Sequence, residues 1–287
     1  MTDPRNREQL TRVYSEETWR VYDALDQSLA PRGPTSLYDV AGSYLSPGSK
    51  ILDAGCRDAA HLIELVRRYG AIGVGFDPVE VHIERAKAAV EAANLEERIQ
   101  VFVGVMQDLP FPDGQFDFVW CRDVVTQVDD LQAALRETAR VLSTDGRMLV
   151  YATLRTDRMS PEETELFSRH LGNVPANLVE RNLEDAFASA GLTIESKEVI
   201  GTEWREYAEE RSKPASLSLL RLSRFRRRHD ALVAQFGQDI CDSVEANLHW
   251  EVFQFLGKLL PTVYVLRSRR RRAESSTAHP SEIVAPP

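Results

Sequence analysis

Residues 48–155 alternate between short apolar runs and longer amphipathic runs, and this alternation constrains the fold more than any other feature of the chain. Apolar runs that we interpret as strands lie at 51–53, 71–76, 99–103, 118–121 and 148–153. Helical patterns lie at 61–69, 79–93 and 131–142. Strands that alternate with helices of about 10–15 residues are typical of βαβ units. We therefore expect an α/β fold with a doubly wound, mostly parallel sheet.

Two later runs, 192–199 and 263–266, bring the expected sheet to seven strands. A helical stretch separates them that is too long for a connection inside a compact sheet. We divide the chain into N-terminal cap helices at 1–47, a core at 48–200, a helical cap insertion at 201–258, the last strand of the core at 259–268, and a disordered basic and polar tail at 269–287.

Composition excludes several classes of function. The formal net charge of −9 disfavours general binding to nucleic acid, which needs a positive surface. No apolar run approaches the ~20 residues that span a membrane, and the N-terminus is polar. Cys56, Cys121 and Cys241 are scattered and odd in number, which favours reduced thiols. We expect a cytoplasmic protein with no metal site and no membrane partner.

The turn after the first strand contains Asp53 and Gly55, and the second strand ends in Asp77 and Pro78. In open α/β sheets, ligands bind at the carboxyl ends of the strands. Gly55 lets the backbone approach a ligand, Asp53 is placed for an ammonium group, and Asp77 for ribose hydroxyls. The alternative for Asp77 is a simple cap of the next helix. A dinucleotide enzyme would have more glycines in this turn, where Arg57 and two alanines stand.

Residues 104–117, GVMQDLPFPDGQFD, together with Ile51–Cys56 and Asp77, resemble the class I S-adenosylmethionine-dependent methyltransferases, in particular the methyltransferase type 11 group. The resemblance covers about 48–155 and implies a Rossmann-like sheet with S-adenosyl-L-methionine as cofactor. It also implies the cofactor-binding residues, which are Asp53, Gly55, Cys56, Asp77, Pro78, Val105, Met106, Cys121 and Arg122, with Asp58 as a further candidate.

The chain departs from the family pattern at three positions. Arg57 and Ala59 stand where the family has glycines, and Val105 replaces the acid that commonly meets the adenine amino group. These departures leave open a second interpretation, a module that binds the cofactor without transferring a methyl group.

Candidates for catalysis are Asp123, after the fourth strand, and His249, on a cap helix. The alternatives are a helix cap for Asp123 and a packing role for His249. Candidate substrate contacts are Arg57, Trp19, Glu203 and Trp204, although packing between cap helices would also explain the aromatic residues.

The sequence therefore predicts a methyltransferase that acts on a small, largely apolar organic molecule, with self-association into a homo-oligomer left open. A second alternative is an anionic substrate, such as a prenyl diphosphate, held by Arg221, Arg224 and Arg226–Arg228. The alternative is that these arginines bind no ligand and form a solvated helix face.

Overall fold

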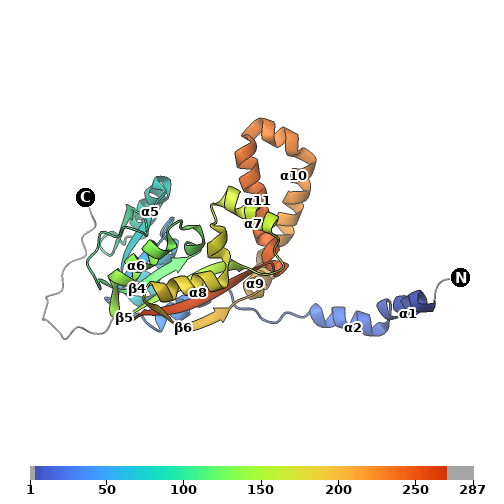
Figure 1. Cartoon of the computed structure of the whole chain (residues 1–287), viewed down its shortest axis with the longest axis horizontal. Helices are drawn as coiled ribbons and strands as arrows, with labels where there is room; N and C mark the ends of the chain where they lie inside the picture. Colours follow the sequence, from blue (N-terminus) through green and yellow to red (C-terminus); the bar gives the residue numbers. More distant parts are fainter. Residues whose placement is uncertain (1–3, 270–287) are drawn as a thin grey trace.

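The computed structural model describes residues 4–269, and its centre is a seven-stranded sheet (Figure 1). The strand order is β3-β2-β1-β4-β5-β7-β6, in which β7 runs antiparallel to both neighbours and the other pairs are parallel. This arrangement confirms the predicted fold class. The strands are β1 (Lys50–Ala54), β2 (Ile72–Asp77), β3 (Ile99–Val103), β4 (Phe116–Arg122), β5 (Leu142–Arg155), β6 (Leu192–Val199) and β7 (Leu259–Ser268).

Helices cover both faces of the sheet, and side chains that alternate along each strand pack against them. Leu52 and Ala54 point into the core cluster under α6 (Leu131–Val141) and α8 (Glu180–Ser189). Ile51 belongs to the opposite cluster, under α3 (Ser36–Gly42), α4 (Ala60–Tyr69) and α5 (Glu80–Ala92). Asp53 follows Ile51 by two positions and so shares its face, which places a carboxyl group at the end of a buried strand.

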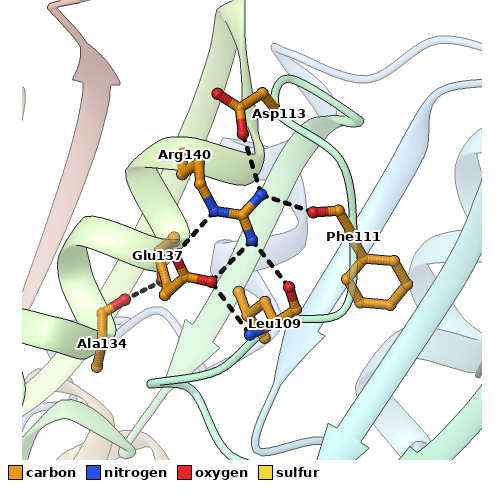
Figure 2. A network of polar contacts seen from close by, with 7 residues as sticks. Leu109, Phe111, Asp113, Ala134, Glu137 and Arg140 are labelled. Atoms are coloured by element: carbon orange, nitrogen blue, oxygen red, sulfur yellow. Dashed lines mark hydrogen bonds and ion pairs between the residues drawn. The ribbon is translucent and has the colours of Figure 1, made fainter.

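The loop after β3, which contains the LPF segment, is held by one arginine on α6 (Figure 2). Arg140 donates to the carbonyl oxygens of Leu109 and Phe111 at 2.8 and 2.6 Å, and to the carboxylates of Asp113 and Glu137 at 3.1 and 2.7 Å. Glu137 in turn accepts a bond from the Leu109 amide at 3.2 Å. These bonds fix the course of the loop beside the sheet.

The N-terminal helices do not cover the sheet, contrary to the prediction of a cap. Helices α1 (Pro4–Val13) and α2 (Glu16–Leu25) extend away from the body of the molecule, and α2 has no buried residue (Figure 1). The chain returns to the body at Arg32, whose guanidinium pairs with Glu198 and Glu203 at 2.5 and 2.7 Å. Only α3, at the end of the predicted 1–47 segment, packs against the sheet.

The late insertion is helical, and it consists of three separate helices rather than two long ones. Helix α9 (Glu203–Ser212) ends at Lys213, which has φ +51°, and Pro214 begins α10 (Pro214–Phe236). Helices α10 and α11 (Gln238–Phe255) form a hairpin that stands away from the sheet, beside α7 (Pro161–Leu171) (Figure 1). The two remaining helical turns are η1 (Val125–Gln127) and η2 (Pro175–Leu178).

The predicted disordered tail, 269–287, lies outside the described residues except for Arg269, which bonds the Gly191 carbonyl at 2.8 Å. Between residues 4 and 269, no helix is long and apolar enough to cross a membrane. The same residues contain no cluster of three or more His, Cys, Asp or Glu side chains that could hold a metal ion.

Candidate functional site

A pocket of about 590 Å³ opens at the carboxyl ends of β1, β2 and β4. This is the edge at which a doubly wound sheet binds its ligands. Nine residues predicted from the sequence line it, and they are Asp53, Gly55, Cys56, Arg57, Asp58, Asp77, Pro78, Arg122 and Asp123. Its other lining residues are Ala60, His61, Val79, His82, Trp120, Val124, Gln127 and Val128.

The turn after β1 is tight because two successive amides share one acceptor. The N–H groups of Gly55 and Cys56 both donate to the Phe76 carbonyl oxygen at 2.9 Å, which joins the ends of β1 and β2. Gly55 has φ +73°, and a Cβ atom there would lie 2.4 Å from Cγ2 of Val124. Only glycine fits this position, as the sequence predicts.

Arg57 and Ala59, which replace family glycines, keep the glycine backbone. Their φ angles are +52° and +60°, in the left-handed region that costs non-glycine residues roughly 1–2 kcal/mol each. Ala59 is fully buried, whereas the Arg57 side chain is exposed. The substitutions therefore leave the shape of the turn intact at a cost in strain, and strain of this kind is concentrated at functional sites.

Asp77 is a well-connected carboxylate at the end of β2. Its Oδ2 accepts from the Arg57 amide at 3.1 Å, and its Oδ1 accepts from the Val79 amide at 2.9 Å. The His82 ring lies 3.0 Å from the same Oδ1. Asp77 thus bonds the amide of Val79, the residue just before α5, and also faces the pocket. Sequence reasoning missed His82, although its place one turn into the helix after Asp77 was a usable signal.

Asp53 is almost completely buried at the base of the pocket, and its Oδ2 has no hydrogen-bond partner. Burial is the main cause that raises the pKa of Asp53 to about 8, and the nearby carboxylates of Asp77 and Asp58 add to it. An unpaired buried carboxyl oxygen is costly. The site therefore gains free energy from a ligand that offers a donor here, and a cationic donor gains most.

Arg122, at the end of β4, belongs to a chain of three side chains. Its Nη1 lies 2.6 Å from Nε2 of His61, and Nδ1 of His61 lies 2.6 Å from the Tyr38 hydroxyl oxygen. Burial and the Arg122 charge lower the pKa of His61 to about 4, so the ring is neutral near pH 7. Because a guanidinium only donates, Nε2 accepts and Nδ1 carries the proton. His61 and Tyr38 were missed because nothing in their local sequence marks them.

Asp123 follows Arg122 with φ +58° and accepts a bond from the Thr153 hydroxyl at 3.2 Å. Asp123 is exposed at the surface of the pocket, although many protein atoms lie around its carboxyl group. Desolvation by these atoms raises the pKa of Asp123 to about 6, against the opposing effects of Arg122 and Thr153. A carboxylate with a pKa near neutrality is suited to accept a proton. The alternative interpretation, a helix cap, gains no support, since η1 has no side-chain cap.

Three predicted cofactor contacts do not line the pocket. Cys121 and Met106 are buried in the core cluster beneath α6, and Val105 is exposed in the loop after β3. Cys121 lies between strands β1 and β5, paired with Ala54 and Val150, so its side chain points to the face opposite Trp120.

The structure places four other candidates away from the pocket. Trp19 lies on the extended α2 and is 59% exposed. Glu203 is engaged with Arg32, and Trp204 stacks on Tyr151 in the core with ring centroids 5.0 Å apart. His249 bonds the Glu245 carbonyl of its own helix at 2.9 Å. All four residues were expected at the pocket because the cap helices were expected to close over the sheet. The cap helices instead stand beside the sheet.

The basic run on α10 lines a separate groove of about 380 Å³ between α10 and α11. Arg221, Arg224 and Arg228 face Val244 and Leu248 across it. Arg226 and Arg227 are exposed but do not line the groove. No residue lines both the groove and the pocket.

The fold defines an α/β protein of the Rossmann-like class, with a pocket at the carboxyl ends of β1, β2 and β4. Residues 52–150 match the family model described as a methyltransferase domain. These residues are therefore a methyltransferase domain of the class I, S-adenosylmethionine-dependent family, which confirms the resemblance found in the sequence.

Curated relatives and solved structures extend the comparison. Sterol 24-C-methyltransferase ERG6B of Gibberella zeae is 31% identical over 42% of this chain and 32% of its own length. Glycine/sarcosine/dimethylglycine N-methyltransferase of Actinopolyspora halophila is 28% identical over 50% of this chain and 26% of its own length. The solved cyclase SpnF has a TM-score of 0.64 and 17% identity, over 81% of this chain and 80% of that one. The matched part of this chain thus covers only about a third or less of the length of the two methyltransferases. The likeness to SpnF shows a common fold and nothing more.

Proposed function

We propose that this protein transfers a methyl group from S-adenosyl-L-methionine to a small, largely apolar organic acceptor. The observation that carries the proposal is the orphaned, buried Oδ2 of Asp53 in a pocket that also presents Asp77. Asp53 would pair with the ammonium group of the cofactor, and Asp77 would bind its ribose hydroxyls. The bare backbone at Gly55 leaves room for the chain between them. These residues fit the cofactor that the family uses.

The remaining pocket residues suit the acceptor side of the reaction. Bound S-adenosylmethionine would supply a methyl group already activated on a sulfonium, so positioning of the acceptor accounts for much of the catalysis. Trp120, Val124 and Val128 give the pocket apolar walls. Asp123 is the candidate general base for an acceptor that must lose a proton.

Calorimetric titration with S-adenosylmethionine and S-adenosylhomocysteine tests the first half of the proposal. Binding of both at micromolar to millimolar concentration is expected, and a folded protein that binds neither contradicts it. Formation of S-adenosylhomocysteine across a metabolite panel tests transfer. With an acceptor in hand, the rate should rise with pH through about 6 as Asp123 ionises, and Asp123→Asn should remove that dependence.

A second candidate function is cofactor binding without methyl transfer. A solved protein of the same fold is described as a [4+2]-cyclase, so the fold is not confined to methyl transfer. The retained turn at Arg57 and Ala59 argues for normal cofactor binding but does not distinguish the two functions. Binding of S-adenosylmethionine with no turnover across the panel would favour this candidate.

Three further expectations from the sequence stay predictions. An anionic prenyl substrate at the arginines of α10 would have to bind in the α10–α11 groove, apart from the pocket, and Arg224→Ala should then weaken it. Self-association finds support in the exposed Trp19, Tyr22 and Leu25 of α2, and light scattering over a range of concentrations tests it. The cytoplasmic location awaits cell fractionation.

A further inference from the structure

Arg122 is a partly buried cation that feels the carboxyl groups of Asp53 and Asp123 but forms no ion pair with either. Its Nε is buried and has no hydrogen-bond partner. Within residues 4–269, its contacts are the neutral His61 ring and the face of Tyr151, whose centroid lies 5.4 Å from the guanidinium carbon. No carboxylate in that part of the chain forms an ion pair with it. Asp53 and Asp123 act on Arg122 only from a distance, so its partly buried guanidinium, with an unpaired Nε, still has donors to offer to an anion.

The guanidinium is also held in place. His61 fixes one Nη group, and the Tyr38 hydroxyl receives the His61 proton on the other side of the ring. The ring of Tyr38 stacks on Trp120, with centroids 5.5 Å apart and an interplanar angle of 9°. Side chains from α3, α4, β4 and β5 thus keep a positive charge at the pocket wall. A fixed fork of N–H donors matches a carboxylate or phosphate.

The order of the strands indicates which ligand would supply the anion. Asp77 ends β2, Asp53 is the next-to-last residue of β1, and Arg122 ends β4, and these three strands are neighbours in the sheet. Asp77 and Asp53 are assigned to the two ends of the cofactor. Arg122 lies one strand further on, next to Asp123 and paired across the sheet with Tyr151 of β5. It therefore faces the acceptor side of the pocket.

We propose that Arg122 binds an anionic oxygen group, a carboxylate or phosphate, carried by the acceptor. The acceptor is then an organic acid whose apolar part lies against Trp120 and Val128, and whose methylated atom is placed by this ion pair. His61 and Tyr38 act as positioning residues for the guanidinium. This inference rests on the proposed function, since it takes the neighbouring subsite to be that of the cofactor.

The test uses full-length protein saturated with S-adenosylhomocysteine and three probes of similar shape, benzoate, phenyl phosphate and the neutral benzamide. Calorimetry at low ionic strength should detect binding of one or both anions at millimolar concentration, and much weaker binding of benzamide. Arg122→Met should weaken anion binding about ten- to hundredfold, as expected for a hydrogen bond to a charged group. Arg122→Lys should recover part of it, and Arg85→Met, an exposed arginine on α5, should change nothing.

Results that contradict the role of Arg122 can be told apart from results that contradict the proposed function. If neither anion binds wild-type protein, or both bind Arg122→Met equally well, Arg122 is not an anion site. Methylthioadenosine lacks the amino-acid part of the cofactor, so it shows whether Arg122 binds the cofactor's own carboxylate. If Arg122→Met weakens S-adenosylhomocysteine but not methylthioadenosine, Arg122 serves the cofactor and the inference is wrong. If wild-type protein does not bind S-adenosylhomocysteine at all, the proposed function itself fails.

Discussion

The backbone amide of Arg57 donates a hydrogen bond to the Asp77 carboxylate over 3.1 Å, and this bond joins the turn after β1 to the acid at the end of β2. The bond depends on the left-handed backbone of Arg57, which has φ +52°. A residue that departs from the family pattern therefore holds the candidate ribose-binding acid in place through its main chain. The Arg57 side chain is free to serve another purpose at the mouth of the pocket.

We expect Arg57→Gly to stabilise the fold slightly. Glycine removes a left-handed strain of roughly 1–2 kcal/mol but adds about 0.5–1 kcal/mol of backbone entropy to the unfolded chain, so the net gain should be about 0.5–1 kcal/mol. Denaturant unfolding measures it. S-adenosylhomocysteine affinity should stay within about twofold because the amide bond to Asp77 is kept. If the side chain contacts the acceptor, as the sequence suggests, only the acceptor KM rises. A less stable Arg57→Gly protein would contradict the strain argument.

We expect Asp77→Ala to weaken S-adenosylhomocysteine binding by about 1.5–3 kcal/mol, or roughly ten- to hundredfold. The ribose hydroxyls lose a charged acceptor, and the Arg57 and Val79 amides lose theirs. Asp77→Asn serves as a partner variant because it keeps an acceptor oxygen for one amide. Calorimetry on variants that unfold at the wild-type denaturant midpoint separates binding from folding. An unchanged dissociation constant would reduce Asp77 to its bonds with the Arg57 and Val79 amides.

The LPF loop gives a prediction about stability. Arg140→Met removes the guanidinium bonds to the carbonyl oxygens of Leu109 and Phe111 and to the carboxylate of Glu137. Hydrogen bonds to charged groups contribute about 1.5–3 kcal/mol each, not additively, so we expect a loss of about 2–4 kcal/mol in unfolding free energy. Arg136→Met, an exposed arginine on the same helix, is the matched control and should cost less than about 0.5 kcal/mol. Equal effects in the two variants would show that the network does not stabilise the loop.

The sheet and the cofactor turn could be predicted because local signals report them. Strand and helix periodicity specifies βαβ units, and Gly55 and Asp77 occupy positions defined by the turn that they belong to. The parts that could not be predicted depend on contacts distant in sequence. His61 meets Arg122 across 61 positions, and Arg32 meets Glu203 across 171. Trp204 looked like a substrate contact because an aromatic residue near a turn has the same local pattern whether it lines a pocket or stacks on Tyr151.

The pKa of Asp53 gives the basis for the last prediction. Burial raises the pKa of this carboxyl to about 8, so in the free protein it holds a proton at neutral pH. An ammonium group of the ligand needs the ionised form, and binding must therefore release that proton. The affinity for S-adenosylhomocysteine should rise as pH increases from 6 toward about 8, by at most about tenfold per pH unit, and level off above it.

Asp53→Asn should abolish this pH dependence and weaken the complex at pH 8, where the wild-type carboxylate is formed. Methylthioadenosine, which has no ammonium group, should bind both proteins with little dependence on pH. A second readout needs no ligand. Since folded Asp53 binds its proton more tightly than the unfolded chain does, its contribution to the unfolding free energy falls as pH rises from about 4 to about 8. Asp53→Asn lacks this contribution, so the stability of the variant relative to wild type should increase across the same window. A wild-type affinity that does not vary with pH, or an Asp53→Asn protein with the same slope, would show that Asp53 does not meet the ammonium group.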